Sequence, residues 1–223
     1  MPRRSELSRS DLWDAVHVER RALIADLQGL EPEQWEAASG CAGWTVHDVA
    51  AHLVDVWTTT RLGFARRLLA AGFDFDRDNQ LGVERERRAT PAETLRAMRD
   101  AAGRTDAPPA PLASRLVEEI AHGDDIRRPL GIAHPYPLGA VMPALDHQLA
   151  TPAAFGGAKE RLGGMRLVAT DARLRRGDGP EVRGTALALL LVATGRDVAL
   201  EELAGEGAAL LREASPDVGS APW

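Results

Sequence analysis

The sequence contains one cysteine, Cys41, and one lysine, Lys159, among its 223 residues. A single cysteine cannot form an internal disulfide bond, so no covalent cross-link stabilises the fold and a reducing compartment is expected. Aromatic residues make up 4% of the chain, and 33 acidic residues outnumber 27 basic ones, which gives a formal net charge of −6. This acidic balance argues against a dedicated nucleic-acid-binding protein, which presents a basic face.

Long apolar segments are also missing. The longest extends from Ala186 to Ala193, far short of the roughly 20 residues that a membrane-spanning helix needs. The N-terminal residues are charged and lack the apolar region of a signal peptide. Because 44% of the residues are hydrophobic, the chain is not a disordered protein and is long enough to build a core. We therefore expect a cytoplasmic protein that contacts neither membrane nor nucleic acid.

The first 150 residues show the apolar spacing and capping signals of helices. Thr45 and Asp48 form a variant capping box, and Thr90, Pro91 and Glu93 mark the clearest helix start. The charged stretch 74–88 predicts a solvated helix or connector, and the prolines of 105–111 predict a linker. The first predicted helix is capped by Ser10 or Asp11, and a short turn follows it at Glu31–Trp35. Further helices are predicted over residues 45–71, 90–103, 113–128 and 138–150.

The composition changes after residue 150. Met165–Thr170 has the pattern of a strand, and Glu181–Arg183 is a second, shorter candidate. A buried helix over Thr185–Thr194 and a small helical tail follow. We therefore predict a mainly α fold, with a helical bundle at 1–150 and a small C-terminal α/β domain at 151–223.

Histidines and carboxylates on the helices are candidate metal ligands, because bundles build metal sites from such residues projecting inward. His47 and His52 are separated by about 140° around a helix, at roughly 100° per residue, and cannot share a face. The apolar stripe next to them consists of Val49, Leu53, Val56 and Trp57. His52 lies about 60° from Val49 by the same step. We predict that His52 points inward and that His47 is solvated.

The helix at 113–128 supplies the other candidates. Glu118 and His122 are i,i+4 neighbours, and Asp125 lies three residues further on, so all three project from one side, whereas Glu119 faces elsewhere. A third ligand from a facing helix would leave one coordination position open, as in catalytic zinc sites. The spacing alone leaves an alternative open, because inward histidines are often hydrogen-bonded core residues and Glu–His pairs occur on ordinary helix surfaces.

Three segments resemble the mycothiol-dependent maleylpyruvate isomerase family, which belongs to the DinB-like metal-binding four-helix proteins. The first is Cys41-Ala-Gly-Trp-Thr-Val-His-Asp-Val-Ala-Ala-His52-Leu53, and the second is Glu118-x-x-x-His122-Gly-Asp-Asp125. The third is the C-terminal region, over 166–171, 177–184 and 188–196. Two residues depart from the family pattern: Ala42 replaces a proline and Leu174 replaces a tryptophan. The resemblance implies a DinB-like four-helix bundle with a small C-terminal α/β segment.

The resemblance also implies a site and a reaction. The metal of this family, most often zinc, would be held by His52, Glu118 and His122. Mycothiol would bind at the open coordination position. A metal-coordinated thiol is deprotonated and nucleophilic at neutral pH. In the isomerase it adds to a cis double bond, and rotation and elimination give the trans product. Addition of the thiol to another small electrophile, an S-transferase reaction, would need the same site.

Other residues near these motifs have open roles. Asp125 either orients a ligand histidine or is a surface charge. Cys41 is expected to pack in its turn rather than to act as nucleophile or fourth ligand, and Trp44 to close the end of the bundle. Arg183 is a candidate for binding a cofactor carboxylate, as is the pair Arg127-Arg128, with ion pairing as the alternative.

Two further functions remain open from the sequence. The bundle could be a non-enzymatic metal-binding or regulatory module, or its ligand set could be vestigial, with function residing in surface contacts. The expected partners of an enzyme are a small thiol and a small electrophile. The chain is predicted to be a monomer or a homodimer.

Overall fold

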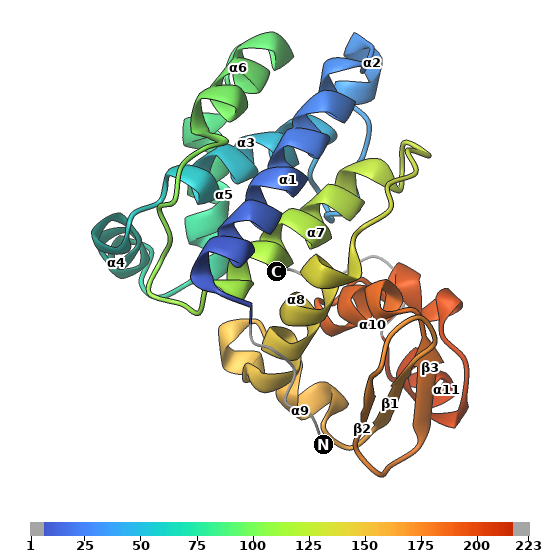
Figure 1. Cartoon of the computed structure of the whole chain (residues 1–223). Coiled ribbons are helices and arrows are strands. Elements are labelled where there is room, and N and C mark those ends of the chain that lie inside the picture. Colours follow the sequence, from blue (N-terminus) through green and yellow to red (C-terminus); the bar gives the residue numbers. More distant parts are fainter. Residues whose placement is uncertain (1–6, 216–223) are drawn as a thin grey trace.

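Four helices form the bundle in the computed structural model, which describes residues 7–215. They are α1 (Arg9–Gln28), α3 (Val46–Thr58), α6 (Pro91–Ala101) and α7 (Ala113–Arg127). Each contacts two others, in the ring α1–α7–α3–α6. Figure 1 shows this bundle beside a smaller C-terminal part. The predicted mainly α fold is confirmed. None of the helices in the described part of the chain is long and apolar enough to cross a membrane.

Short helices surround the bundle. The short α2 (Pro32–Trp35) confirms the turn predicted at this place. On the other side of the bundle, α4 (Arg61–Ala70) and α5 (Phe75–Glu86) follow α3, and α5 packs against it. The helix α8 (Leu138–Ala150) has the predicted bounds and packs against α7. The predicted linker at 105–111 contains no helix or strand.

Local capping explains where the main helices begin. The side chain of Thr45 accepts from the backbone N–H of Asp48, whose carboxylate accepts from the backbone N–H of Thr45, so the predicted capping box is present. The box at Thr90 and Glu93 is also confirmed. The first helix, in contrast, is capped by Ser8 with Asp11, so the predicted cap at Ser10 or Asp11 is wrong. Ser8 thus supplies the kind of serine cap that was predicted at Ser10.

The predicted helix over 45–71 is wrong, because α3 ends at Thr58 and α4 begins at Arg61. Thr59 is in an extended conformation and its hydroxyl donates to the backbone carbonyl of Asp55. Thr60 caps the next helix by accepting from Gly63. Threonine hydroxyls that bond to nearby backbone groups compete with helical hydrogen bonds, which explains a break without proline or glycine.

The charged stretch at 74–88 is a helix, but only one face of it is solvated. Asp78, Gly82 and Val83 of α5 are buried. The guanidinium of Arg67 on α4 binds Asp55 of α3 at 2.7 Å and Asp78 at 2.8 Å. The charge density that predicted a solvated connector therefore includes a partly buried ionic network between three helices.

The C-terminal part contains a small sheet with the order β2-β1-β3. The strand β1 (Arg166–Ala169) pairs antiparallel with β2 (Arg175–Arg176) and parallel with β3 (Glu181–Gly184), with Leu167 opposite Arg176 and Val182. Both predicted strands are confirmed, and β2 was not predicted. The other elements are η1 (Ala153–Phe155), α9 (Lys159–Leu162), α10 (Ala186–Ala193), η2 (Asp197–Glu202) and α11 (Glu206–Ala214).

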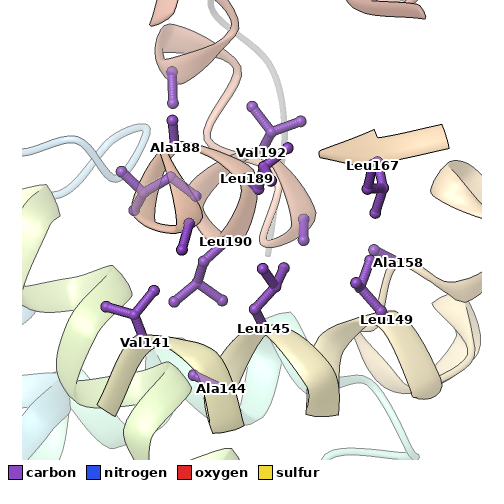
Figure 2. Close-up of a cluster of buried hydrophobic side chains, with 14 of the residues drawn as sticks. Val141, Ala144, Leu145, Leu149, Ala158, Leu167, Ala188, Leu189, Leu190 and Val192 are labelled. Atoms are coloured by element: carbon purple, nitrogen blue, oxygen red, sulfur yellow. The ribbon is translucent and has the colours of Figure 1, made fainter. Parts of the chain in front are cut away.

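The apolar core extends from the bundle into the C-terminal part. Val141, Leu145 and Leu149 of α8 face Leu189 and Leu190 of α10, with Leu167 of β1 beside them (Figure 2). The same buried cluster includes Trp13, Leu116 and Ile120 of the bundle. The helix α8 therefore contributes its apolar face to the C-terminal core. The division into domains at 1–150 and 151–223 stays a prediction.

The contact between α5 and α3 makes Gly82 sensitive to substitution. A Cβ atom at this position would lie 2.8 Å from Asp55 Oδ2, and this carboxylate is held by Arg67 and Arg85. We expect Gly82→Ala to lower the free energy of unfolding by about 1–2 kcal/mol, because overpacking forces a shift of the helices. Urea denaturation measures this. Gly139→Ala on the exposed side of α8 meets no atom within 4 Å and should leave stability unchanged or slightly raised.

Candidate metal centre

Two helices of the bundle carry the predicted ligands. His52 lies in the middle of α3, and Glu118 and His122 lie one turn apart on α7, which contacts α3. The prediction that His52 points inward is confirmed, since His52 and His122 are both buried. Their imidazole rings meet edge to face, with centroids 4.8 Å apart. The structure therefore brings together the three residues that the sequence singled out.

The carboxylate of Glu118 lies between the two imidazoles. Its Oε2 atom is 3.4 Å from Nε2 of His122 and 3.8 Å from Nε2 of His52. The three donor atoms all lie within 4.8 Å of one another. The side chain of Glu118 is 28% exposed, against 4% for His52 and 8% for His122. The group is therefore reached from solvent on the side of Glu118.

The second nitrogen of His122 is bound to Asp125. Nδ1 of His122 donates to Oδ2 of Asp125 at 3.0 Å, and the guanidinium of Arg196 donates to the same oxygen at 2.6 Å. Burial would raise the pKa of Asp125, but Arg196 and His122 outweigh this effect and hold the carboxyl pKa far below its usual range. Asp125 is buried, so the alternative prediction of a surface charge is wrong.

Cys41 contacts this group from the loop before α3. The backbone N–H of Gly40 donates to the carbonyl of Asp125 at 2.7 Å, which places the loop against α7. The thiol of Cys41 donates to Oδ2 of Asp125 at 3.0 Å and lies 3.7 Å from Nδ1 of His122. Burial raises the pKa of the Cys41 thiol. Cys41 therefore packs in the core, as predicted, and also makes a polar contact.

Cys41, His122 and Asp125 form a second group with metal-ligand geometry in the described part of the chain. A guanidinium already neutralises this group, because Arg196 Nη2 lies 2.6 Å from Asp125 Oδ2 and 3.4 Å from His122 Nδ1. A metal cation there would be repelled by Arg196. A metal ion there would place two positive charges side by side in the core, which costs free energy. The group of His52, Glu118 and His122 is therefore the better candidate.

Comparison with known proteins relates this geometry to a family. The family model described as the mycothiol maleylpyruvate isomerase N-terminal domain matches residues 16–117. Residues 16–117 therefore belong to this domain family. The matched residues include His52, whereas Glu118 and His122 follow directly after them.

Two solved structures share the fold of this chain. They are crystal structures of the mycothiol-dependent maleylpyruvate isomerase and of a histidine-to-alanine mutant of it. Each has a TM-score of 0.63 and 13% sequence identity, and the match covers 97% of this chain and 95% of the other. The shared fold therefore includes the C-terminal part as well as the bundle. A search of curated proteins found no match.

Trp44 of the family-like Gly-Trp-Thr turn forms a wall of the candidate metal centre. Its ring lies 5.2 Å from the ring of His52, measured between centroids. Its indole N–H donates to the side chain of Gln80 on α5 at 3.2 Å. Trp44 is partly exposed, so it covers His52 without sealing the group from solvent.

The structure differs from the sequence prediction at His47 and gives Arg196 a contact that was not predicted. The prediction that His47 is solvated is wrong: His47 is buried, and its Nε2 bonds to the hydroxyl of Thr94 at 2.8 Å. The reason is that α6 covers this side of α3, so both sides of the helix are partly buried. Arg196, for which the sequence predicted no role, follows α10 and contacts Asp125 on α7. Its position after a buried apolar helix carried no signal for this contact.

The remaining candidate residues form ion pairs. Arg127 donates to Asp26 and Arg128 to Asp124, each at 2.7 Å. Arg183 lies on β3 and donates to Glu181 at 2.8 Å. These pairs match the ion-pairing alternative, and the binding role of Arg183 stays a prediction.

Proposed function

We propose that this protein is a metal-dependent enzyme that uses mycothiol to isomerise an electrophilic substrate or to add to it. The observation that carries the proposal is the meeting of His52, Glu118 and His122 from two helices, with their donor atoms within 4.8 Å. Family membership supports mycothiol as the thiol. We further propose that the metal is zinc, the second substrate is a small electrophile and the location is cytoplasmic.

The spacing of the donor atoms fits a metal ion. In a tetrahedral zinc site with bonds of about 2.0–2.1 Å, neighbouring ligand atoms lie about 3.4 Å apart. The two distances from Glu118 to the histidines, 3.4 and 3.8 Å, agree with this value. Three protein ligands leave one tetrahedral position, as in catalytic zinc sites. The exposure of Glu118 supports access to that position.

The residues around the ligands have separate tasks in this proposal. His52, Glu118 and His122 would hold the metal, which when bound supplies a positive charge that stabilises a thiolate at neutral pH. Asp125 accepts the Nδ1 proton of His122 and so directs Nε2 toward Glu118. Arg196 keeps Asp125 ionised. Trp44 provides an apolar wall over His52.

Metal analysis followed by thiol titration tests the proposal. Purified protein is expected to contain about one zinc ion per chain, or to bind one on titration. Calorimetry should then show mycothiol binding to the zinc-loaded protein and none to chelator-treated protein. A chain that takes up no divalent metal would contradict both the enzyme and the metal-binding module. Metal uptake without thiol binding would leave the non-enzymatic module.

Asp125 provides a more specific test of the ligand arrangement. We expect Asp125→Asn to weaken zinc binding about 10–100-fold, because a neutral amide no longer accepts the His122 proton as strongly and no longer balances the charge of Arg196. Competition with a chromogenic chelator measures the affinity. Asp124→Asn is the matched control, because Asp124 binds Arg128 on another side of α7. Equal affinities for the two variants would contradict the role of Asp125.

A further inference from the structure

Arg115 places a guanidinium beside the candidate metal centre. Its side chain is 6% exposed, and Nη2 lies 3.7 Å from Oε1 of Glu118, about one turn later on α7. The other oxygen of Glu118, Oε2, faces Nε2 of His52 and Nε2 of His122. Arg115 thus approaches the ligand group without occupying its donor atoms. Because Arg115 is buried, solvent and salt screen its charge only weakly.

The stability of its own helix does not explain the position of Arg115. Arg115 lies in the first turn of α7, where a positive charge opposes the helix dipole. An ion pair in which the arginine precedes the glutamate is also the less favourable order on a helix. The Nε atom of Arg115 is buried and has no hydrogen-bond partner within residues 7–215, which lowers stability. Local interactions therefore disfavour this guanidinium, which indicates a role in the adjacent site.

The acidic residues of α3 and α7, the two helices that carry the ligands, are each paired with an arginine. Next to His122, Asp125 binds Arg196 at 2.6 Å, and on the other side of α7 Glu119 binds Arg20 at 2.9 Å. The histidines of a metal site are neutral when they bind the metal. The protein groups around the site therefore balance one another, and the whole charge of a divalent cation would remain uncompensated.

We propose that Arg115 makes the open coordination position of the candidate metal centre selective for an anionic ligand. This inference rests on the proposed metal-binding function. Because Arg115 compensates the charge of Glu118, the metal-loaded site is more positive than the same ligands would be without the arginine. An additional positive charge stabilises an anion, such as a thiolate that has released its proton to solvent, and destabilises the metal cation. Arg115 is thus a specificity-determining residue with opposite effects on the two.

An anionic and a neutral probe on the metal-loaded protein test this selectivity. Cobalt(II) binds the same kinds of ligands as zinc, and its visible absorption changes when a further ligand binds. Thiocyanate is the anionic probe for the cobalt-loaded full chain, and imidazole is the neutral one. Arg115→Met should weaken thiocyanate binding about tenfold and leave imidazole binding within about twofold of the wild type, because only the anion interacts with the lost charge.

The metal affinity gives a second readout, which a purely structural role would move in the opposite direction. Arg115→Met should bind zinc at least as tightly as the wild type and up to about tenfold more tightly, because the repulsion between guanidinium and cation is lost. Arg115→Lys keeps the charge and should keep the preference for thiocyanate. Arg127→Met is the matched control, since it removes another buried arginine of α7, one that pairs with Asp26 outside the ligand group. It should leave the binding of both probes unchanged.

Two results would overturn the role of Arg115 and leave the proposed function intact. One is an Arg115→Met variant that binds zinc and thiocyanate with wild-type affinities. The other is a variant that loses its metal or binds both probes equally weakly, which would show that Arg115 only maintains the shape of the site. A wild-type chain that takes up no divalent metal would contradict the proposed function, and this inference with it. The metal content of the wild type therefore distinguishes the two failures.

Discussion

Replacing His52 with alanine is expected to abolish stoichiometric metal binding. His52 is the only proposed ligand on α3, and Glu118 and His122 of α7 would remain as a pair on one helix. Two ligands do not hold zinc at the three-ligand affinity of a catalytic site. We expect the metal content to fall from about one ion per chain to less than about a tenth, and mycothiol binding to be lost with it.

Glu118→Ala should give the same loss, because its carboxylate links the two imidazoles. His47→Ala is the matched control: it removes another buried histidine of α3, one that bonds to Thr94 and lies outside the ligand group. Inductively coupled plasma mass spectrometry of the dialysed proteins measures the metal content. Full metal content in the His52→Ala variant would contradict the proposed ligand set, whatever its effect on activity.

The second large effect concerns stability. Glu119→Ala is expected to lower the free energy of unfolding by about 3–5 kcal/mol, because it leaves a buried guanidinium without its counter-charge. Arg20 donates to Glu119 at 2.9 Å, and both side chains are almost completely buried. Glu119 also accepts from the indole N–H of Trp57 at 3.1 Å. Chemical denaturation with urea measures the change.

A double substitution separates charge from packing in this network. Arg20→Met combined with Glu119→Leu replaces the ion pair by apolar side chains of similar size. We expect it to recover part of the stability, because the buried charge is gone but the indole N–H of Trp57 still lacks its acceptor. The guanidinium also lies 4.8 Å from the ring of Trp57, and the double variant loses this contact. If the free energy of unfolding of the Glu119→Ala variant lies within about 1 kcal/mol of the wild-type value, the expectation is wrong, and water solvates Arg20 in the variant.

The neighbouring residues Glu118 and Glu119 show what helix periodicity can predict from the sequence. The sequence placed Glu118 and His122 on one side of the helix and Glu119 on another, and the structure agrees: Glu119 contacts α1 and Glu118 faces α3. Such directions follow from about 100° per residue and need no knowledge of neighbouring helices. The capping boxes at Thr45 and Thr90 were predictable for the same reason, since their contacts span three residues.

The break after α3 and the burial of His47 could not be read from the same rules. The helix ends at Thr58, and the hydroxyls of Thr58 and Thr59 donate to backbone carbonyls of α3. Such contacts compete with helical hydrogen bonds even where the apolar spacing continues. His47 is buried because α6, more than 40 residues later, covers it. Periodicity identifies the more apolar face of a helix and does not show how many partners the helix has.

The same distinction between local and tertiary determinants applies to Cys41 and to the candidate metal ligands. The scarcity of cysteine determined that no disulfide supports the fold, and local spacing determined which faces His52, Glu118 and His122 occupy. Only the tertiary structure decided that the single thiol lies against Asp125 and that Arg196 neutralises this carboxylate. Arg196 and Asp125 are 71 residues apart in the chain. Contacts over such separations depend on how whole helices pack, whereas caps and helix faces depend on residues within one or two turns.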